Sequence, residues 1–128
     1  GRLRILIIDD DPLLLNSLRD ALESDGHEVV SAGGGQLGIN AFVESHADGK
    51  PFPVVITDLG MPHVDGRKVA STIKASVPST VVLMLTGWGR RLVAEGDIPP
   101  GVDEILSKPP KLADLRAALS AHMGNHTA

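Results

Sequence analysis

Short runs of apolar, mostly β-branched residues recur along the chain, and each run ends abruptly at polar or turn-forming residues. Five such runs predict strands over residues 3–8, 27–32, 54–58, 80–85 and 102–106. Unbroken apolar runs of this length are typical of strands buried on both faces, as in a parallel sheet covered by helices. The run at 27–32 is more polar than the first, which favours a place at the edge of the sheet.

Helical spacing of apolar residues marks the segments between these runs. Helices are expected over about 12–24, from after Gly38 to about 47, and over about 65–75, 90–95 and 112–123. In the first helix the stripe that should face the core comprises Leu14, Leu18, Ala21 and Leu22. Leu13 and Leu15 lie off this stripe and are expected to be partly exposed.

Five strands that alternate with five helices predict an α/β fold, a doubly wound parallel sheet with right-handed crossovers. The segment from Glu95 to Gly101 contains two prolines, which should shorten and distort the fourth helix. We expect residues 1–128 to form one domain, with a core over about 3–123 and a frayed tail at 124–128.

Composition narrows the classes of function. The chain of 128 residues has a formal charge of −4 and no Lys/Arg block, which argues against direct binding to nucleic acid. It has no cysteine, which excludes disulfides and thiolate metal sites and suits a cytoplasmic location. No apolar run approaches the length needed to cross a membrane, so we expect no membrane contact.

Polar residues with complementary chemistry follow four of the predicted strands. These residues are Asp9 and Asp10, Asp58, Thr86 and Lys108. The carboxyl ends of parallel strands share one edge of the sheet, where such folds place their ligands. Three crowded carboxylates need a cation, and hard oxygen ligands favour Mg²⁺. With Mg²⁺ bound, Asp58 could act as a nucleophile toward phosphorus, while Lys108 and Thr86 neutralise and position a phosphoryl group.

The chain resembles the response-regulator receiver domain of two-component signalling over nearly its whole length. The resemblance rests on Asp9-Asp10, on Asp58-Leu59-Gly60-Met61-Pro62 with Asp65-Gly66, on Thr86, and on Lys108-Pro109. It implies a flavodoxin/CheY-like (βα)5 three-layer sandwich with strand order 2-1-3-4-5. It also implies a bacterial, cytoplasmic phosphoprotein that acts in signal transduction and is not an enzyme, apart from self-phosphorylation and autodephosphorylation.

The resemblance assigns a role to each matching residue. Asp58 would become an aspartyl phosphate, with a phosphohistidine on a sensor histidine kinase or histidine phosphotransfer domain as donor. Asp10 would bind Mg²⁺, or Mn²⁺ as a substitute, together with Asp58. Asp9 would reach the metal directly or through water, and the Gly60 carbonyl would complete the protein ligands.

Further roles follow from the same resemblance. Thr86 would bind a phosphoryl oxygen and Lys108 would pair with the phosphoryl group, and the Lys108–Pro109 bond would be cis. For Asp11, a charge at a helix N-terminus competes evenly with a role in the site. For Trp88, gating of water competes with simple packing. The resemblance leaves open a homodimer, an output domain, and a fused kinase, as in hybrid sensor kinases.

Two positions depart from the pattern of the family. Ile105 replaces the switch aromatic that commonly stands three residues before the lysine, so the usual coupling between threonine and aromatic cannot operate in its standard form. Gly87 follows Thr86 where alanine is more usual. Together with the distorted fourth helix, these departures predict an unusual output surface or a domain that mainly relays phosphate.

Three other functions fit parts of the chain. Gly33-x-Gly35-x-x-Gly38 matches a dinucleotide-binding fingerprint, although it would follow the second strand. Asp9-x-Asp11 fits a phosphohydrolase of the haloacid-dehalogenase type, although Asp58 then has no role. The third alternative is a phosphate-independent pseudo-receiver that only binds partners, which the complete set of acidic, Thr and Lys residues disfavours.

Overall fold

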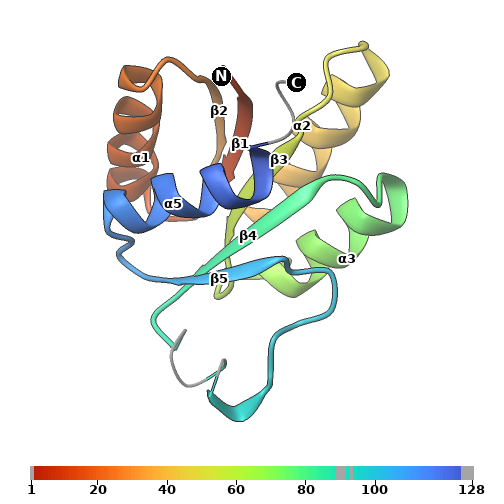
Figure 1. The fold of residues 1–128 in the computed structure, drawn as a ribbon. Coiled ribbons are helices and arrows are strands. Elements are labelled where there is room, and N and C mark those ends of the chain that lie inside the picture. Colours follow the sequence, from red (N-terminus) through yellow and green to blue (C-terminus); the bar gives the residue numbers. More distant parts are fainter. Residues whose placement is uncertain (1, 89–91, 93, 125–128) are drawn as a thin grey trace.

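The computed structural model describes residues 2–88, 92 and 94–124, and strands and helices alternate from β1 to β4 (Figure 1). The strands are β1 (Arg4–Ile8), β2 (Glu28–Ala32), β3 (Val54–Asp58), β4 (Val81–Thr86) and β5 (Glu104–Ser107). The helices between and after them are α1 (Pro12–Ser24), α2 (Gly35–Ala47), α3 (Gly66–Ser76) and α5 (Leu112–Met123). Among the described residues, every helix is too short or too polar to cross a membrane.

The five strands form one parallel sheet in the order β2-β1-β3-β4-β5, which confirms the predicted strand order and the edge position of β2. The register brings the strand ends together. Ile8 lies between Ala32 and Thr57, and Asp58 pairs with Leu85. The residues that follow β1, β3, β4 and β5 therefore meet at one edge of the sheet.

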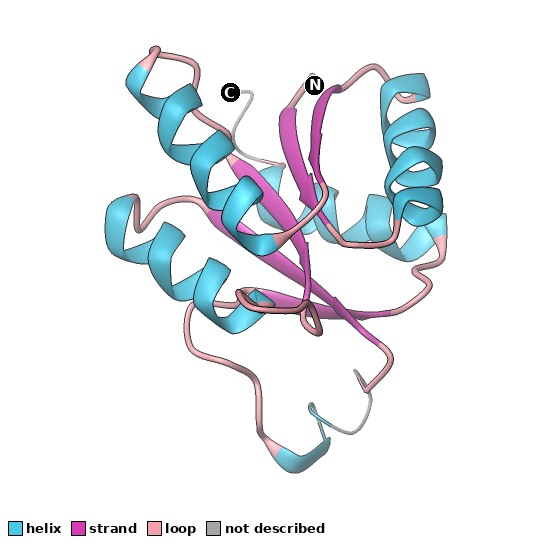
Figure 2. Ribbon diagram, turned by 180° about the vertical axis from the view of Figure 1, so that it is seen from behind, coloured by secondary structure: helices cyan, strands magenta, loops and turns pink. Residues whose placement is uncertain are grey.

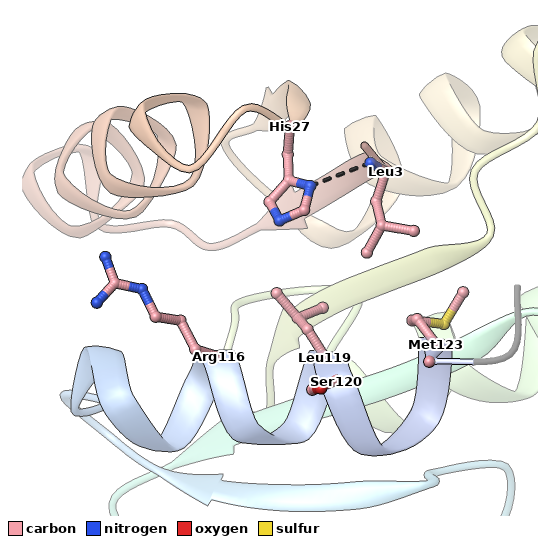
Figure 3. A pocket seen from close by; sticks show the side chains of 7 residues that line it. Leu3, His27, Arg116, Leu119, Ser120 and Met123 are labelled. Carbon is pink, nitrogen blue, oxygen red and sulfur yellow. Dashed lines mark hydrogen bonds between the residues drawn. The ribbon is translucent and has the colours of Figure 1, made fainter. Parts of the chain in front are cut away.

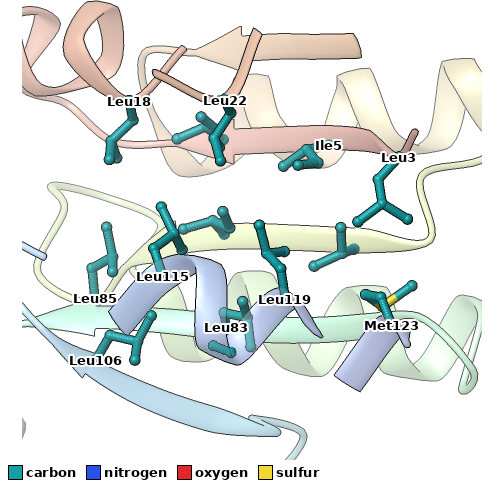
Figure 4. Packing of buried hydrophobic residues seen from close by; sticks show 14 of the residues in the cluster. Leu3, Ile5, Leu18, Leu22, Leu83, Leu85, Leu106, Leu115, Leu119 and Met123 are labelled. Carbon is teal, nitrogen blue, oxygen red and sulfur yellow. The ribbon is translucent and has the colours of Figure 1, made fainter. Parts of the chain in front are cut away.

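Helices cover both faces of the sheet (Figures 1 and 2). On one face α1 and α5 pack on the strands through an aliphatic core (Figure 4) that includes Leu18, Leu22, Leu115 and Leu119. On the other face α2 and α3 pack through a second core that contains Phe42 and Ile73. The three layers confirm the predicted doubly wound fold, and the buried strands explain the unbroken apolar runs in the sequence.

The orientation of α1 differs from the prediction at one residue. Leu15 is 8% exposed, whereas Leu13 is 80% exposed. Leu15, Leu18 and Leu22 are three and four residues apart, so they share a helix face, and this face points into the core. Leu14 lies at its margin and is only partly buried. The expectation that Leu15 is partly exposed was therefore wrong.

Other boundaries also differ from the prediction. Helix α2 begins at Gly35, not after Gly38, so both glycines belong to the helix. The short helix expected over 90–95 lies largely outside the described residues, although Leu92, Ala94 and Glu95 are helical. Residues 96–101 form turns and loop, as the two prolines predicted. The last strand begins at Glu104, not at residue 102 as expected. The frayed tail expected at 124–128 lies, apart from Gly124, outside the described residues.

Candidate functional site

The carboxyl ends of β1 and β3 bring three carboxylates together. One oxygen each of Asp9, Asp10 and Asp58 lies within 4.8 Å of the others. Asp9 is fully buried and Asp58 is 4% exposed, whereas Asp10 faces solvent. Two buried carboxylates at this spacing repel each other strongly unless positive charge lies between them.

Lys108 supplies one positive charge to this cluster from the loop after β5. Its Nζ lies 3.0 Å from Asp58 Oδ2 and 3.1 Å from Asp9 Oδ2. The Lys108–Pro109 peptide bond is cis, as expected. Burial alone would lower the pKa of Lys108, but its hydrogen bonds to Asp58 and Asp9 outweigh burial and raise the pKa above its usual value. The ammonium group therefore stays charged.

Asp9 is the least satisfied member of the cluster. Burial raises its pKa, the charge of Asp58 adds to this effect, and hydrogen bonds from the Asp11 N–H and from Lys108 oppose it. Asp9 Oδ1 accepts the Asp11 N–H at 2.9 Å. Asp9 Oδ2 is buried and lies close to Lys108 Nζ, but without hydrogen-bond geometry, so among the described residues it has no hydrogen-bond partner.

These observations test whether the site suits a metal ion. A buried oxygen without a donor, beside two further carboxylates, offers the hard ligands that Mg²⁺ prefers. Among the described residues, Lys108 alone pairs with these carboxylates, which leaves excess negative charge that a divalent cation would offset. The residues therefore fit Mg²⁺.

Thr86 ends β4 beside the carboxylates and is 4% exposed. Its Oγ1 accepts the N–H of Trp88 at 3.1 Å, which orients the hydroxyl. The Trp88 side chain is 64% exposed, so it is not packed into the core. At Gly87 an added Cβ would meet nothing within 4 Å, so the missing methyl group leaves open space there.

The loop from β3 to α3 leaves Asp58 along a fixed path. The Leu59 N–H donates to Leu85 O at 3.0 Å, and the Gly66 N–H donates to Leu59 O at 2.8 Å. A Cβ on Gly66 would lie 2.3 Å from Asp58 O, so this position requires glycine. Asp65 caps α3 by accepting the Lys68 N–H at 3.1 Å. Gly60 lies exposed within this loop, two residues after Asp58.

Comparisons with known proteins agree on one family. The family model described as "Response regulator receiver domain" matches residues 5–120. The chain belongs to the response-regulator receiver family. The transcriptional regulatory protein TcrA of Mycobacterium tuberculosis is 32% identical over 92% of this chain, but this chain spans only 45% of TcrA. A probable chemotaxis protein CheY of Rhizobium etli is 29% identical over 96% of this chain and 94% of its own.

Solved receiver structures show the same fold. A response regulator receiver domain protein from Clostridium thermocellum aligns with a TM-score of 0.81 and 30% identity, over 98% of this chain and 97% of its own. The receiver domain of the hybrid histidine kinase CckA aligns with a TM-score of 0.76 over 94% of this chain and 98% of its own. At 21% identity, the CckA match is a likeness of fold alone.

The position of Asp11 bears on one of the alternative functions. Asp11 caps α1, where its Oδ1 accepts the N–H groups of Leu13 at 3.0 Å and Leu14 at 3.4 Å. This favours the helix-terminus interpretation of Asp11 and weakens the Asp9-x-Asp11 phosphohydrolase. Ile105, which the resemblance places at the position of a switch aromatic, is half-buried in β5.

Two glycines of the glycine motif, Gly35 and Gly38, allow helix α2 to pack closely against its neighbours. A Cβ on Gly35 would lie 2.1 Å from Val64 O, and one on Gly38 would lie 2.3 Å from Ile8 Cδ1. Both glycines pack closely against protein atoms, which favours a packing role over a dinucleotide site. Sequence reasoning missed these contacts. The spacing of the glycines along one helix was the only signal of them.

A cleft of about 220 Å³ lies at the opposite edge of the sheet, between the start of β1 and α5 (Figure 3). Its lining includes Leu3, His27, Leu119 and Met123. His27 Nδ1 accepts the N–H of Leu3 at 3.0 Å. Because the strands are parallel, this amino-terminal edge is remote from the carboxylates.

Proposed function

We propose that Asp58 accepts a phosphoryl group from a phosphohistidine of a sensor histidine kinase or a histidine phosphotransfer domain. The observation that carries this proposal is the meeting of Asp9, Asp10, Asp58 and Lys108 at the carboxyl ends of the strands, with Lys108 3.0 Å from Asp58. These four charged residues serve no evident purpose as isolated caps or surface charges. Membership of the receiver family supports the same conclusion.

The reaction is a single displacement at phosphorus. A carboxylate oxygen of Asp58 attacks the phosphorus atom and forms an O–P bond, while the P–N bond to the imidazole breaks. The electron pair of the broken bond returns to the imidazole nitrogen. The donor leaves as neutral histidine because its ring carries a proton on the other nitrogen or takes one from water. The product on Asp58 is an acyl phosphate, and its later hydrolysis by water would be the autodephosphorylation that ends the signal.

The residues around Asp58 stabilise this transfer. Lys108 already contacts Asp58 Oδ2, and its ammonium would pair with an oxygen of the incoming group. Thr86 Oγ1 accepts the Trp88 N–H, so its own proton can be donated to a second phosphoryl oxygen. A bound Mg²⁺ would neutralise the charge that develops on the phosphoryl oxygens. Its protein ligands would be Asp9, Asp10, Asp58 and the Gly60 carbonyl. Mn²⁺ would substitute for Mg²⁺.

We also propose a location and partners for the domain. We take residues 3–123 as one receiver unit in the cytoplasm, controlled by a kinase that meets it there. Relatives such as TcrA, a transcriptional regulatory protein, are more than twice as long as the aligned region, which supports an output domain as the partner. A fused kinase is the alternative. A phosphorylation-dependent homodimer is a further arrangement that this unit could adopt.

Intact-mass spectrometry after incubation with a small-molecule phosphodonor tests the proposal. In the presence of Mg²⁺ we expect a single adduct with the mass of one phosphoryl group. The adduct should disappear when EDTA is added and should be absent from Asp58→Asn. Asp11→Asn is the matched control, because Asp11 caps α1 and is expected to leave the adduct intact.

The other outcomes distinguish the alternatives. An adduct that persists in Asp58→Asn contradicts the assignment of the acceptor. Multiple turnover of a generic phosphate ester, lost in both Asp9→Asn and Asp11→Asn, would indicate a phosphohydrolase of the haloacid-dehalogenase type. Wild-type protein that binds Mg²⁺ but gains no adduct, even from a phosphorylated histidine phosphotransfer domain, would identify a pseudo-receiver.

A further inference from the structure

Helix α2 is held against the candidate site at two glycines. Gly38 lies against the side chain of Ile8, the residue before Asp9, with a built Cβ only 2.3 Å from Cδ1. Gly35 lies against the backbone of Val64, with a built Cβ only 2.1 Å from the carbonyl oxygen. Real Cβ atoms do not approach other heavy atoms so closely, so α2 reaches both neighbours only because these two residues lack side chains.

The segment that Gly35 contacts has a strained conformation. His63 has a φ of 67°, which is unusual for a residue other than glycine. The Val64 N–H donates to Pro62 O at 2.8 Å and closes a three-residue turn around His63. A turn of this kind with positive φ at its centre is rare and strained, so it persists only where neighbouring structure holds it.

This turn lies in the middle of the loop that carries Gly60. One end of the loop begins at Asp58, and the other is anchored where the Gly66 N–H donates to Leu59 O. Val64 meets α2 through its backbone and side chain, because Gly35 contacts its carbonyl oxygen and Cγ1. The position of the loop backbone relative to the carboxylates therefore depends on the contact between Gly35 and Val64.

We propose that Gly35 is a positioning residue for the candidate metal site, because its contact with Val64 holds the strained turn at His63 and thereby the Gly60 carbonyl. Gly35 touches neither metal nor phosphoryl group. Its effect on Mg²⁺ rests on the proposed function, whereas its effect on the loop does not. Gly35, which belongs to the sequence pattern that matches a dinucleotide fingerprint, thus helps to position the phosphoryl site from helix α2.

Two variants on the same helix and one on the preceding loop test this role. Gly35→Ala requires the Val64 backbone to move by about 1 Å to reach normal contact. Gly38→Ala also overpacks α2, but against the Ile8 side chain, so it lowers stability without pressing on the loop. Gly33→Ala is the neutral control, because an added Cβ there meets nothing within 4 Å.

Amide hydrogen exchange of the metal-free protein is the first measurement. We expect the Val64 and Gly66 N–H groups to exchange about tenfold faster or more in Gly35→Ala, because both depend on the loop conformation. In Gly38→Ala and Gly33→Ala their rates should stay close to those of wild type. Equal acceleration in Gly35→Ala and Gly38→Ala would overturn the proposal, because general destabilisation would then explain both.

Mg²⁺ titration, followed through the fluorescence of Trp88, is the second measurement. A misplaced partner of a metal ligand typically costs about 10- to 100-fold in affinity, and we expect a loss in this range for Gly35→Ala relative to Gly33→Ala. Equal affinities would overturn the proposed effect on the metal. If Gly35→Ala does not fold, Val64→Ala loosens the same contact from the other side and should change both measurements in the same direction.

Failure of the proposed function gives a different result. Wild-type protein that does not bind Mg²⁺ would contradict the metal site, while the exchange rates of Val64 and Gly66 would still decide whether Gly35 holds the loop.

Discussion

Replacing Lys108 with methionine removes an ammonium group that contacts both buried carboxylates. Lys108 Nζ lies 3.0 Å from Asp58 Oδ2 and 3.1 Å from Asp9 Oδ2. Methionine keeps most of the length of the side chain and its contact area, but it leaves Asp9 and Asp58 without compensating charge. Without Mg²⁺ we therefore expect Lys108→Met to be markedly less stable than wild type.

The size of this loss follows from distance and burial. At 3.0 Å and an effective dielectric constant of about 20, each attraction is worth about 5 kcal/mol before the cost of desolvation. Removing one partner of a buried ion pair typically costs about 3–5 kcal/mol, because the remaining charge stays buried. The Lys108 side chain is still 26% exposed, so water screens part of the interaction, and we expect a loss of about 2–3 kcal/mol.

Urea unfolding with EDTA or with saturating Mg²⁺ measures this loss and its rescue. A ligand that binds only the folded state stabilises it by about 2.7 kcal/mol at one hundred times its dissociation constant. Without the competing ammonium, the carboxylates of Lys108→Met should bind Mg²⁺ more tightly than those of wild type. The stability gained on adding Mg²⁺ should therefore be larger in the variant.

Lys111→Met is the control, because Lys111 is an exposed lysine at the start of α5. Its stability should stay within about 0.5 kcal/mol of wild type. If Lys108→Met is as stable as Lys111→Met in EDTA, the buried carboxylates are not both charged and the electrostatic reasoning is wrong. If Mg²⁺ stabilises wild type and Lys108→Met equally, lysine and metal do not compensate the same charges.

Two further predictions concern other parts of the domain. Burial lowers the pKa of His27 below its usual value, and the charge of Asp25 opposes this effect. The unfolded chain therefore binds a proton on His27 more readily than the folded chain does. The free energy of unfolding should fall as pH drops through about 6.5 toward the folded-state pKa. His27→Gln should weaken this pH dependence in urea unfolding, and an unchanged slope would show that the bond to Leu3 in Figure 3 does not sense pH. Leu15→Ala should cost about 2–4 kcal/mol, because Leu15 is 8% exposed. Leu13→Ala should cost less than about 0.5 kcal/mol, and the reverse order would contradict the orientation of α1.

The fold could be predicted because the end of each strand is marked by a change from apolar to polar or turn-forming residues. The apolar runs stop at residues that cannot continue a buried strand, such as Asp9 after β1 and Asp58 at the end of β3. Once all strands are parallel, these ends must share one edge, so the site was predictable from spacing alone. The distances to Lys108 agree with that expectation.

The errors arose where the sequence is ambiguous. Leu14 and Leu15 both stand three or four residues before Leu18, and periodicity alone cannot decide which one faces the sheet. The start of α2 was misplaced because glycine usually marks a turn. At Gly35 and Gly38 it instead permits close packing, and that reason lies in Val64 and Ile8, which are distant in sequence.

The charge balance of the site links metal binding to phosphorylation under the proposed chemistry. In the resting site one lysine faces two buried carboxylates and the exposed Asp10, so a divalent cation is already favoured. Transfer to Asp58 replaces a single negative charge with a phosphoryl group that carries about −2. The need for positive charge then rises, although Lys108 can supply no more than before. Phosphorylation should therefore tighten Mg²⁺ binding, and by reciprocity Mg²⁺ must favour the phosphorylated state by the same factor.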